Sequence, residues 1–255
     1  MDMNEYIKKV LDNRFSNYSI SGIQGGNTEA NLFRISCRNE SYILKTQNSG
    51  LKHEYLNYKW LEGKVPVPKV KFYYSGKCEM LCMSELAGNT LEYYINKADP
   101  REIVILYAAA LKLLHSVAPD KLALRQDLKN RIAKAKYNVE NHLIDILSMQ
   151  YENQSVEPSK LFAKLISLTP EMAYPVFTHG DYCFDNIIFN GKILSGFIDM
   201  GNGGVGDKYQ DIALASRNIT DFFGNEYLPL FYEHYGLEDI NKEKIDFYIL
   251  LDEFF

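Results

Sequence analysis

The sequence predicts a two-lobed α+β protein in which a strand-rich part precedes a mainly helical part. Two observations carry this prediction. Segments rich in β-branched and aromatic residues dominate residues 18–47 and 70–86, whereas helix-like sequence dominates from about residue 101 onward. Runs of strands followed by runs of helices are typical of α+β proteins. The 255 residues, 46% of them hydrophobic, are enough for one large domain or two closely packed lobes.

The strand-rich part opens with three expected strands, YSISGI, ANLFRIS and SYILKT, which are separated by the turn-forming sequences GGN and RNE. A helix is expected over residues 51–62, where four apolar residues recur at helical spacing: Leu51, Tyr55, Tyr58 and Leu61. The two prolines of GKVPVPKV favour extended backbone and end this helix. Residues 70–86 are then expected to form a second hairpin.

The C-terminal part is expected to be mainly helical over residues 101–169, with a polar interruption near QYENQSVEPS. Short strands are expected after residue 175, in PVFTHG and in the pair IIFN and ILSGFID. The remainder is expected to be helical to the end of the chain. Neither an internal repeat nor a low-complexity segment interrupts this order.

The composition excludes several classes of protein. A chain with 19 Tyr and 14 Phe is not expected to be disordered. The N-terminus MDMNEYIKKV lacks a signal-peptide core, and the longest apolar run, residues 103–111, is too short to span a bilayer. The four cysteines form no zinc-binding spacing. We therefore expect a cytoplasmic protein with reduced thiols and no membrane association.

The charge is distributed unevenly along the chain. Residues 176–255 carry 14 Asp and Glu against 5 Lys and Arg, whereas residues 1–175 carry 19 against 23. An acidic C-terminal part disfavours nucleic acid as a partner and would attract a cationic ligand. On charge alone, a solvated acidic surface explains the same pattern equally well.

Three glycines in GFIDMGNGGVGDKYQDIA match the written form of a dinucleotide-binding turn. Gly201, Gly203 and Gly206 spell G-x-G-x-x-G after a strand-like run and before a helix-like one. A dinucleotide-binding domain needs alternating strands and helices, and after Gly206 only helix-like sequence remains. We therefore do not predict a dehydrogenase. Gly201, Gly203 and Gly204 are instead expected to let the chain turn sharply and approach closely beside Asp199.

Polar side chains suited to phosphoryl chemistry gather just upstream. THGDYCFDNIIF contains His179, Gly180, Asp181 and Asn186, and Asp199 follows in FIDMG. Carboxylate and amide oxygens are ligands that Mg²⁺ prefers, and a further Asp with a free face could position a hydroxyl group and accept its proton. H-G-D alone is a weak signal, but H-G-D-x-x-x-x-N followed by a strand and I-D-x-G is a specific one.

These motifs resemble the catalytic and metal-binding loops of the aminoglycoside phosphotransferases, which are related to the protein kinases. WLEGKVPVPKV resembles the helix-to-strand passage of that family, MSELAG its interlobe hinge, and YILLDEFF the C-terminus of its 3'-phosphotransferase branch. The resemblance covers nearly the whole chain. It implies a protein-kinase-like fold with a nucleotide-binding lobe at residues 1–85, a helical lobe at 86–255, and an insertion at about 118–172.

The resemblance also implies roles for five residues. Asp181 matches the catalytic Asp, and Asn186 and Asp199 match the two Mg²⁺ ligands. Lys45 matches the strand lysine that holds the α- and β-phosphates of ATP, and Glu54 matches the helix acid that pairs with it. His179 and Asp211 are expected to have structural roles, with Asp211 bracing the catalytic loop.

Further nucleotide contacts follow from the same resemblance. Ile43 shares a strand face with Lys45 and is expected to cover the adenine. The family often has an aromatic residue there, which leaves the preference for ATP over GTP open. The backbone between Ser84 and Leu86 is expected to meet the adenine edge, and Thr28 is expected near the β-phosphate.

The implied acceptor is a polycationic aminoglycoside of the kanamycin or neomycin type, phosphorylated at its 3'-hydroxyl, which would confer resistance. Asp252, Glu253 and the terminal carboxylate of Phe255 match the amine-binding tail of the family. No nucleic acid, membrane or obligate protein partner is expected.

Two departures bear on the drug spectrum. Asn202 stands where the 3'-branch usually has Arg, and the insertion is less acidic than the family pattern, with Glu152 and Glu157 unaligned. A related kinase with another antibiotic or metabolite acceptor stays open as an alternative. A nucleotide-binding pseudokinase is disfavoured because all five matched residues are intact.

Overall fold

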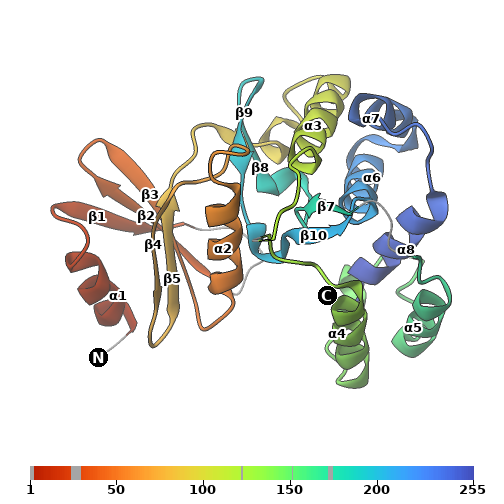
Figure 1. Cartoon of the computed structure of the whole chain (residues 1–255), viewed down its shortest axis with the longest axis horizontal. Helices are drawn as coiled ribbons and strands as arrows, with labels where there is room; N and C mark the ends of the chain where they lie inside the picture. The colour runs from red at the N-terminus through yellow and green to blue at the C-terminus, as the bar shows by residue number, and fades with distance from the viewer. Residues whose placement is uncertain (1–2, 24–29, 122, 151, 172–174) are drawn as a thin grey trace.

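The computed structural model describes residues 3–23, 30–121, 123–150, 152–171 and 175–255. A twisted sheet with two helices forms one end of the molecule, and a mainly helical lobe forms the other (Figure 1). This arrangement confirms the predicted α+β class and its order of strands before helices. The division at residues 85 and 86 itself stays a prediction.

The N-terminal lobe is built on a five-stranded antiparallel sheet in the order β1-β2-β3-β5-β4. The hairpins expected from sequence supply all five strands, and the predicted helix is α2. The elements are α1 (Met3–Asp12), β1 (Tyr18–Gly22), β2 (Asn31–Cys37), β3 (Glu40–Gln47), α2 (Leu51–Leu61), β4 (Val70–Ser75) and β5 (Glu79–Ser84). Helix α1 was not predicted.

The two faces of this sheet pack against different partners, as side-chain alternation requires. Tyr42 and Leu44 of β3 pack with Ile7 and Leu11 of α1 in a core of their own. Ile43, on the opposite face of β3, packs against the main core of the molecule. Helix α2 also contributes buried side chains to the main core, so it is anchored to the helical lobe as well as to the sheet.

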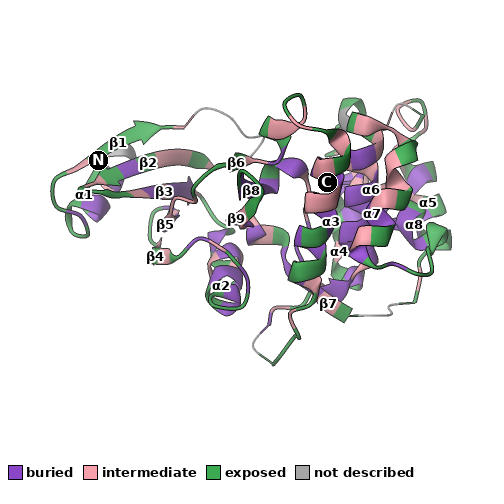
Figure 2. Cartoon of the chain, turned by 90° about the horizontal axis from the view of Figure 1, so that it is seen from above, coloured by how far each residue is buried: buried purple, intermediate pink, exposed green. Residues whose placement is uncertain are grey.

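The C-terminal lobe surrounds its core with helices whose inner faces are buried (Figure 2). Its helices are η1 (Glu92–Tyr94), α3 (Pro100–His115), α4 (Leu128–Glu140), η2 (Ile146–Ser148), α5 (Pro158–Ser167), η3 (Phe184–Asn186), η4 (Met200–Asn202), α6 (Tyr209–Phe223), η5 (Asn225–Tyr227), α7 (Leu228–Tyr235) and α8 (Lys242–Asp252). Two small sheets complete the lobe, β6-β8-β9 and β7-β10, formed by β6 (Asn89–Thr90), β7 (Pro175–Thr178), β8 (Ile187–Asn190), β9 (Ile193–Phe197) and β10 (Gly204–Asp207).

Local sequence explains where several of these helices begin and end. Asp99 caps α3 by accepting a hydrogen bond from the Arg101 amide, and Pro100 occupies the first turn, where its missing N–H costs nothing. Asn241 caps α8 in the same way. Gly236 ends α7 in the left-handed conformation, which glycine adopts without strain.

Two strands were not predicted from the sequence, the two-residue β6 and β10. β10, which follows the glycine-rich loop, lies where only helix was expected, and it pairs antiparallel with β7. Asp207 is the last residue of β10, and its carboxylate accepts a hydrogen bond from the Tyr209 amide. Four residues containing two glycines carry too little pattern to predict a strand. Within the described residues, no helix is long and apolar enough to cross a membrane.

Candidate active site

Three charged side chains from distant parts of the sequence meet between the lobes. The ammonium group of Lys45, on β3, lies 2.9 Å from the Glu54 carboxylate on α2 and 2.8 Å from the Asp199 carboxylate. Burial by itself would lower the pKa of Lys45, but the two carboxylates outweigh it and raise that pKa above its ordinary value. Lys45 therefore stays charged, which is the state that could hold phosphate oxygens.

The second half of the site is the loop between β7 and β8. Asn186 donates its side-chain amide to the Asp181 carbonyl at 2.9 Å and to the Asp181 carboxylate at 3.1 Å. Burial is the main reason that the pKa of Asp181 is raised above its ordinary value. A carboxylate that is partly buried, oriented and more basic than usual is suited to accept a proton from a hydroxyl group.

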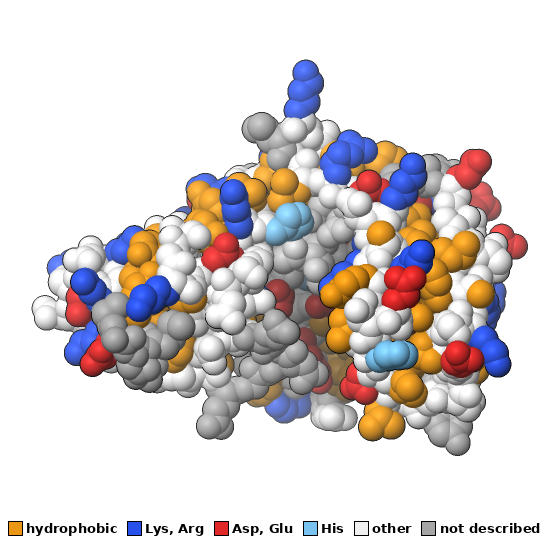
Figure 3. All heavy atoms as spheres, turned by 90° about the horizontal axis from the view of Figure 1, so that it is seen from below, with side chains coloured by type: hydrophobic (Ala, Val, Ile, Leu, Met, Phe, Trp, Pro, Cys, Tyr) orange, Lys and Arg blue, Asp and Glu red, His pale blue; other side chains and the backbone are white. Residues whose placement is uncertain are grey.

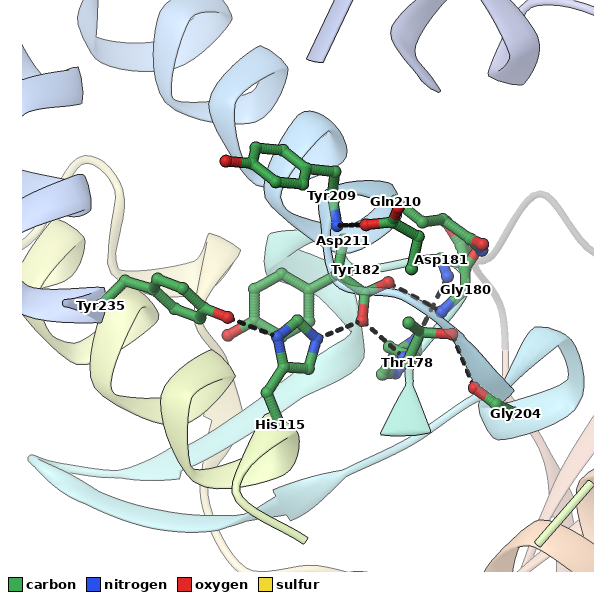
Figure 4. A network of polar contacts seen from close by, with 12 residues as sticks. His115, Thr178, Gly180, Asp181, Tyr182, Gly204, Tyr209, Gln210, Asp211 and Tyr235 are labelled. Carbon is green, nitrogen blue, oxygen red and sulfur yellow. Dashed lines mark hydrogen bonds and ion pairs between the residues drawn. The ribbon is translucent and has the colours of Figure 1, made fainter. Parts of the chain in front are cut away.

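Asp211, the first acid of α6, fixes the loop between β7 and β8 through hydrogen bonds to its backbone (Figure 4). Its side chain is fully buried and accepts hydrogen bonds from the backbone amides of His179 at 2.6 Å and Gly180 at 2.9 Å. The His115 ring bridges Asp211 and the Tyr235 hydroxyl at 2.9 Å on each side. The bracing role expected for Asp211 is therefore observed, and His115 joins it as a partner that the sequence did not indicate.

His179 and Gly180 shape the loop without offering chemistry to a substrate. Nε2 of His179 donates to the Ile198 carbonyl at 2.9 Å, which ties the loop to the residue before Asp199. Gly180 has φ of 83°, and a Cβ there would overlap the carbonyl oxygen of Asn202. Only glycine satisfies both conditions, so the H-G-D motif is explained by backbone geometry as much as by Asp181.

Asp199 itself is held in an unusual backbone conformation. Its φ of 56° and ψ of 50° are left-handed, which costs a non-glycine residue about 1–2 kcal/mol. Such a conformation persists only when the surrounding structure holds it in place. The side chain of Asp199 consequently points to Lys45 rather than continuing the direction of β9.

The side chains of Asn186 and Asp199 fit a magnesium ion. The amide nitrogen of Asn186 is committed to Asp181, which leaves its amide oxygen as a ligand. Asp199, with a side chain that is 30% exposed, keeps a second carboxylate oxygen besides the one that contacts Lys45. One carboxylate and one amide oxygen, completed by phosphate and water, are a typical Mg²⁺ environment.

The residues expected to contact the nucleotide base lie on β3 and at the end of β5. Ile43 is on the predicted strand face, toward the main core. The Ser84 amide donates to the Lys69 carbonyl and the Glu85 amide to the Ser41 carbonyl, so both are used within the N-terminal sheet. Leu86 is the next residue along the chain. Thr28 lies outside the described residues.

The C-terminal acids Asp252 and Glu253 already have partners within the protein. Asp252 lies 2.6 Å from the Arg217 guanidinium and 3.9 Å from that of Arg131, and Glu253 accepts a hydrogen bond from the Asn153 amide at 2.8 Å. The second carboxylate oxygen of Glu253, Oε1, is buried without a partner in the described part of the chain. Asp252 is also among the charges that raise the pKa of Asp181, which places the tail beside the catalytic loop.

Phe255 ends the chain with its ring half exposed and the Arg131 guanidinium 5.1 Å from the ring centroid. Phe254 is fully buried, and its carbonyl accepts a hydrogen bond from Asn138 in α4. The insertion therefore packs around the C-terminus through both α4 and the segment that contains Asn153.

A cavity of about 890 Å³ lies between the insertion, α6 and α8. Arg217 lines it, and its acidic lining residues are Glu152, Asp221, Glu243 and Asp246. The molecule is also hollowed between its two lobes, where acidic side chains are visible (Figure 3). The sequence analysis did not single out Asp221 or Arg217. The local sequence shows only that an acid and a base lie one helical turn apart on α6.

Comparison with known proteins gives a consistent result. A model of the phosphotransferase enzyme family matches residues 19–248. An aminoglycoside 3'-phosphotransferase of Enterococcus faecalis is 35% identical over 243 residues, covering 90% of this chain and 91% of the relative. An aminoglycoside 3'-phosphotransferase of Niallia circulans is 38% identical over 198 residues, covering 77% of this chain and 75% of the relative.

Two solved structures show the same fold. An aminoglycoside-3'-phosphotransferase of type VIII superposes with a TM-score of 0.83 at 24% identity, over 98% of both chains. A Streptomyces rimosus aminoglycoside phosphotransferase in complex with ADP and streptomycin superposes with a TM-score of 0.78 at 22% identity, over 100% of this chain and 99% of the other. These likenesses confirm the predicted two-lobed kinase-like fold.

Proposed function

Because the chain belongs to the phosphotransferase enzyme family, we propose that it transfers the γ-phosphoryl group of ATP to the 3'-hydroxyl of kanamycin- or neomycin-type aminoglycosides. One observation carries the proposal: Lys45, Glu54 and Asp199 are already assembled, while Asp181 and Asn186 lie in the loop that precedes β8. A cation and two magnesium ligands held beside a positioned carboxylate are the parts that phosphoryl transfer needs.

Each nucleotide-side residue has a distinct part. Lys45, aimed by Glu54, binds the α- and β-phosphates, and Asn186 and Asp199 hold Mg²⁺, which neutralises phosphate charge when bound. Ile43 covers the adenine. Since the Ser84 and Glu85 amides are used within the sheet, the Leu86 N–H is the donor that we assign to the adenine edge. Thr28 is assigned to the β-phosphate from its sequence position alone.

Asp181 acts on the acceptor. Its carboxylate orients the 3'-hydroxyl and takes its proton as the oxygen forms a bond to the γ-phosphorus. The bond from that phosphorus to the β,γ-bridging oxygen breaks, and ADP leaves. The product carries a phosphate where the antibiotic had a hydroxyl group, which removes a hydrogen-bond donor, adds negative charge and so accounts for resistance.

The cationic acceptor is held by the acidic C-terminal part. Asp252, Glu253 and the Phe255 carboxylate bind its ammonium groups. Asp221 and Glu152 line the adjoining cavity, which Lys164, Arg217 and Lys242 also line. The contact of Asp252 with Arg217 keeps that carboxylate oriented until the acceptor arrives.

The test is steady-state ATP turnover with Mg²⁺, comparing kanamycin A with tobramycin, which lacks the 3'-hydroxyl. Turnover with kanamycin A alone supports the proposal. Turnover with both antibiotics keeps the kinase and overturns the 3'-position. Turnover with neither indicates a different acceptor, and ATP binding without turnover on any acceptor would identify a pseudokinase.

Removing the charge of Asp252 tests the amine-binding tail. In Asp252→Asn the KM for kanamycin A is expected to rise about tenfold, because one charge-assisted hydrogen bond contributes about 1.5–3 kcal/mol. The KM for ATP should stay within about twofold. Glu62→Gln, at an exposed N-lobe carboxylate, is the matched control. Equal changes in both KM values would contradict the assignment. Truncating the tail is a poorer test because it removes the buried Phe254.

Glu253 makes acceptor binding depend on pH. Burial raises the pKa of this carboxyl above its ordinary value of 4.5. A bound ammonium group favours the ionised form and lowers that pKa, so binding releases a proton and tightens as pH rises through the raised value. Calorimetric titration with kanamycin A between about pH 5 and 7 should show this slope. The slope should be lost in Glu253→Gln; an equal slope in both proteins would exclude Glu253.

A further inference from the structure

Helix α2, which carries Glu54, contacts the loop after Asp199 through a side chain that the phosphate-binding residues do not explain. Asn57 is completely buried, and its amide nitrogen donates to the Met200 carbonyl at 2.7 Å and to the Gly203 carbonyl at 2.9 Å. Both hydrogens of one side-chain amide are thus used on two carbonyls of the same loop.

His53 lies one turn earlier on the same face of α2. Its Nδ1 lies 2.6 Å from the Gly201 carbonyl, and since a carbonyl can only accept, Nδ1 carries the proton and donates. Two side chains four residues apart therefore hold three carbonyls of the segment 200–203. We call His53 and Asn57 together the α2 clamp.

Gly203 is shaped to receive this clamp. A Cβ at Gly203 would lie 3.2 Å from the amide nitrogen of Asn57 and 3.3 Å from the Phe177 ring, which is tighter than ordinary contacts. The second glycine of G-x-G-x-x-G therefore serves the close approach of α2 to the loop. This is a use of the motif unrelated to dinucleotide binding.

Stability explains only part of the polar choice at position 57. Oδ1 of Asn57 is buried and has no hydrogen-bond partner among the described residues. A buried unsatisfied carbonyl is unfavourable, and an apolar side chain of similar size would avoid it. Asn57 therefore satisfies two carbonyls of the loop while its own Oδ1 stays unsatisfied, which ties this side chain to the position of the loop.

We propose that His53 and Asn57 are positioning residues that lock the metal-binding loop to α2, so that Glu54, Lys45 and Asp199 stay assembled. The clamp begins at the residue next to Asp199 and restrains the loop that keeps Asp199 in its left-handed conformation. Helix and loop then move as one body, and the site needs no activating shift of α2. The expected effect of the clamp on kcat rests on the proposed phosphoryl transfer. The restraint of the loop by His53 and Asn57 does not.

Asn57→Leu removes both donors and keeps the side-chain shape. Amide hydrogen exchange of residues 199–204, measured in the protein without ligands, is expected to become at least tenfold faster. The thermal midpoint is expected to fall modestly, because the buried carbonyls of Met200 and Gly203 lose a donor while only one unsatisfied oxygen, Oδ1, is removed. The kcat for kanamycin A should fall about tenfold to a hundredfold, because small misplacements in a positioned site carry large kinetic effects.

Three comparisons decide the proposal. His53→Gln, which keeps a side-chain donor, should retain more of the rate than His53→Leu, and Leu56→Ala on the exposed face of α2 should match the wild type in exchange and rate. Unchanged exchange in Asn57→Leu would overturn the clamp. Faster exchange with an unchanged rate would overturn its positioning role. If the wild type does not phosphorylate kanamycin A, the proposed function fails separately, and exchange still tests the clamp.

Discussion

Replacing Asp181 with Asn is expected to lower kcat by about 10²–10⁴-fold, the range that a positioned general base contributes. Asn keeps the size of Asp and can still accept the hydrogen bond from Asn186, so the loop should keep its shape. What is lost is the ability to take the proton of the acceptor hydroxyl. ATP affinity should change less than about twofold, because Asp181 acts on the acceptor side.

The measurement is steady-state kinetics with kanamycin A together with thermal unfolding of the same preparations. Asp185→Asn is the matched control, because this carboxylate is exposed in the adjacent η3 turn. The control should keep its rate within about threefold. Near-normal turnover in Asp181→Asn would contradict the proposed function, and a large drop in thermal midpoint would show that the variant reports on folding instead.

Asp211→Ala is expected to have the largest effect on stability, a loss of about 3–5 kcal/mol in the free energy of unfolding, because a fully buried side chain that accepts three hydrogen bonds is removed. The substitution leaves the amides of His179 and Gly180 and the ring of His115 without their acceptor inside the core. For a chain of this size the thermal midpoint should fall by roughly 6–20 °C.

Urea unfolding of the two proteins measures this difference. Asp246→Ala is the control of the same residue type, because Asp246 forms an exposed ion pair with Lys242, one helical turn away. That control should change the unfolding free energy by less than about 0.5 kcal/mol. A loss below about 1 kcal/mol in Asp211→Ala would mean that the catalytic loop does not depend on this brace.

The sequence predicted most of the elements and the core of the site because those features have local causes. The alternation in SYILKT put Ile43 and Lys45 on one strand face, and the structure confirms that face. Likewise, the short spacing from Asp181 to Asn186 placed both side chains in one loop, where they are in contact. The pairing of Lys45 with Glu54 came from resemblance, since neither residue alone differs from an ordinary surface charge.

Only the tertiary structure decided which of these groups are already paired and what holds them. The contact of Asn57 with Gly203 joins residues 146 positions apart, and that of Asp252 with Arg217 joins residues 35 apart. Neither pair leaves a periodic or motif-like trace. Sequence patterns record the preferences of neighbouring residues, whereas partners chosen by packing and by the need to satisfy buried polar groups are set when distant segments meet.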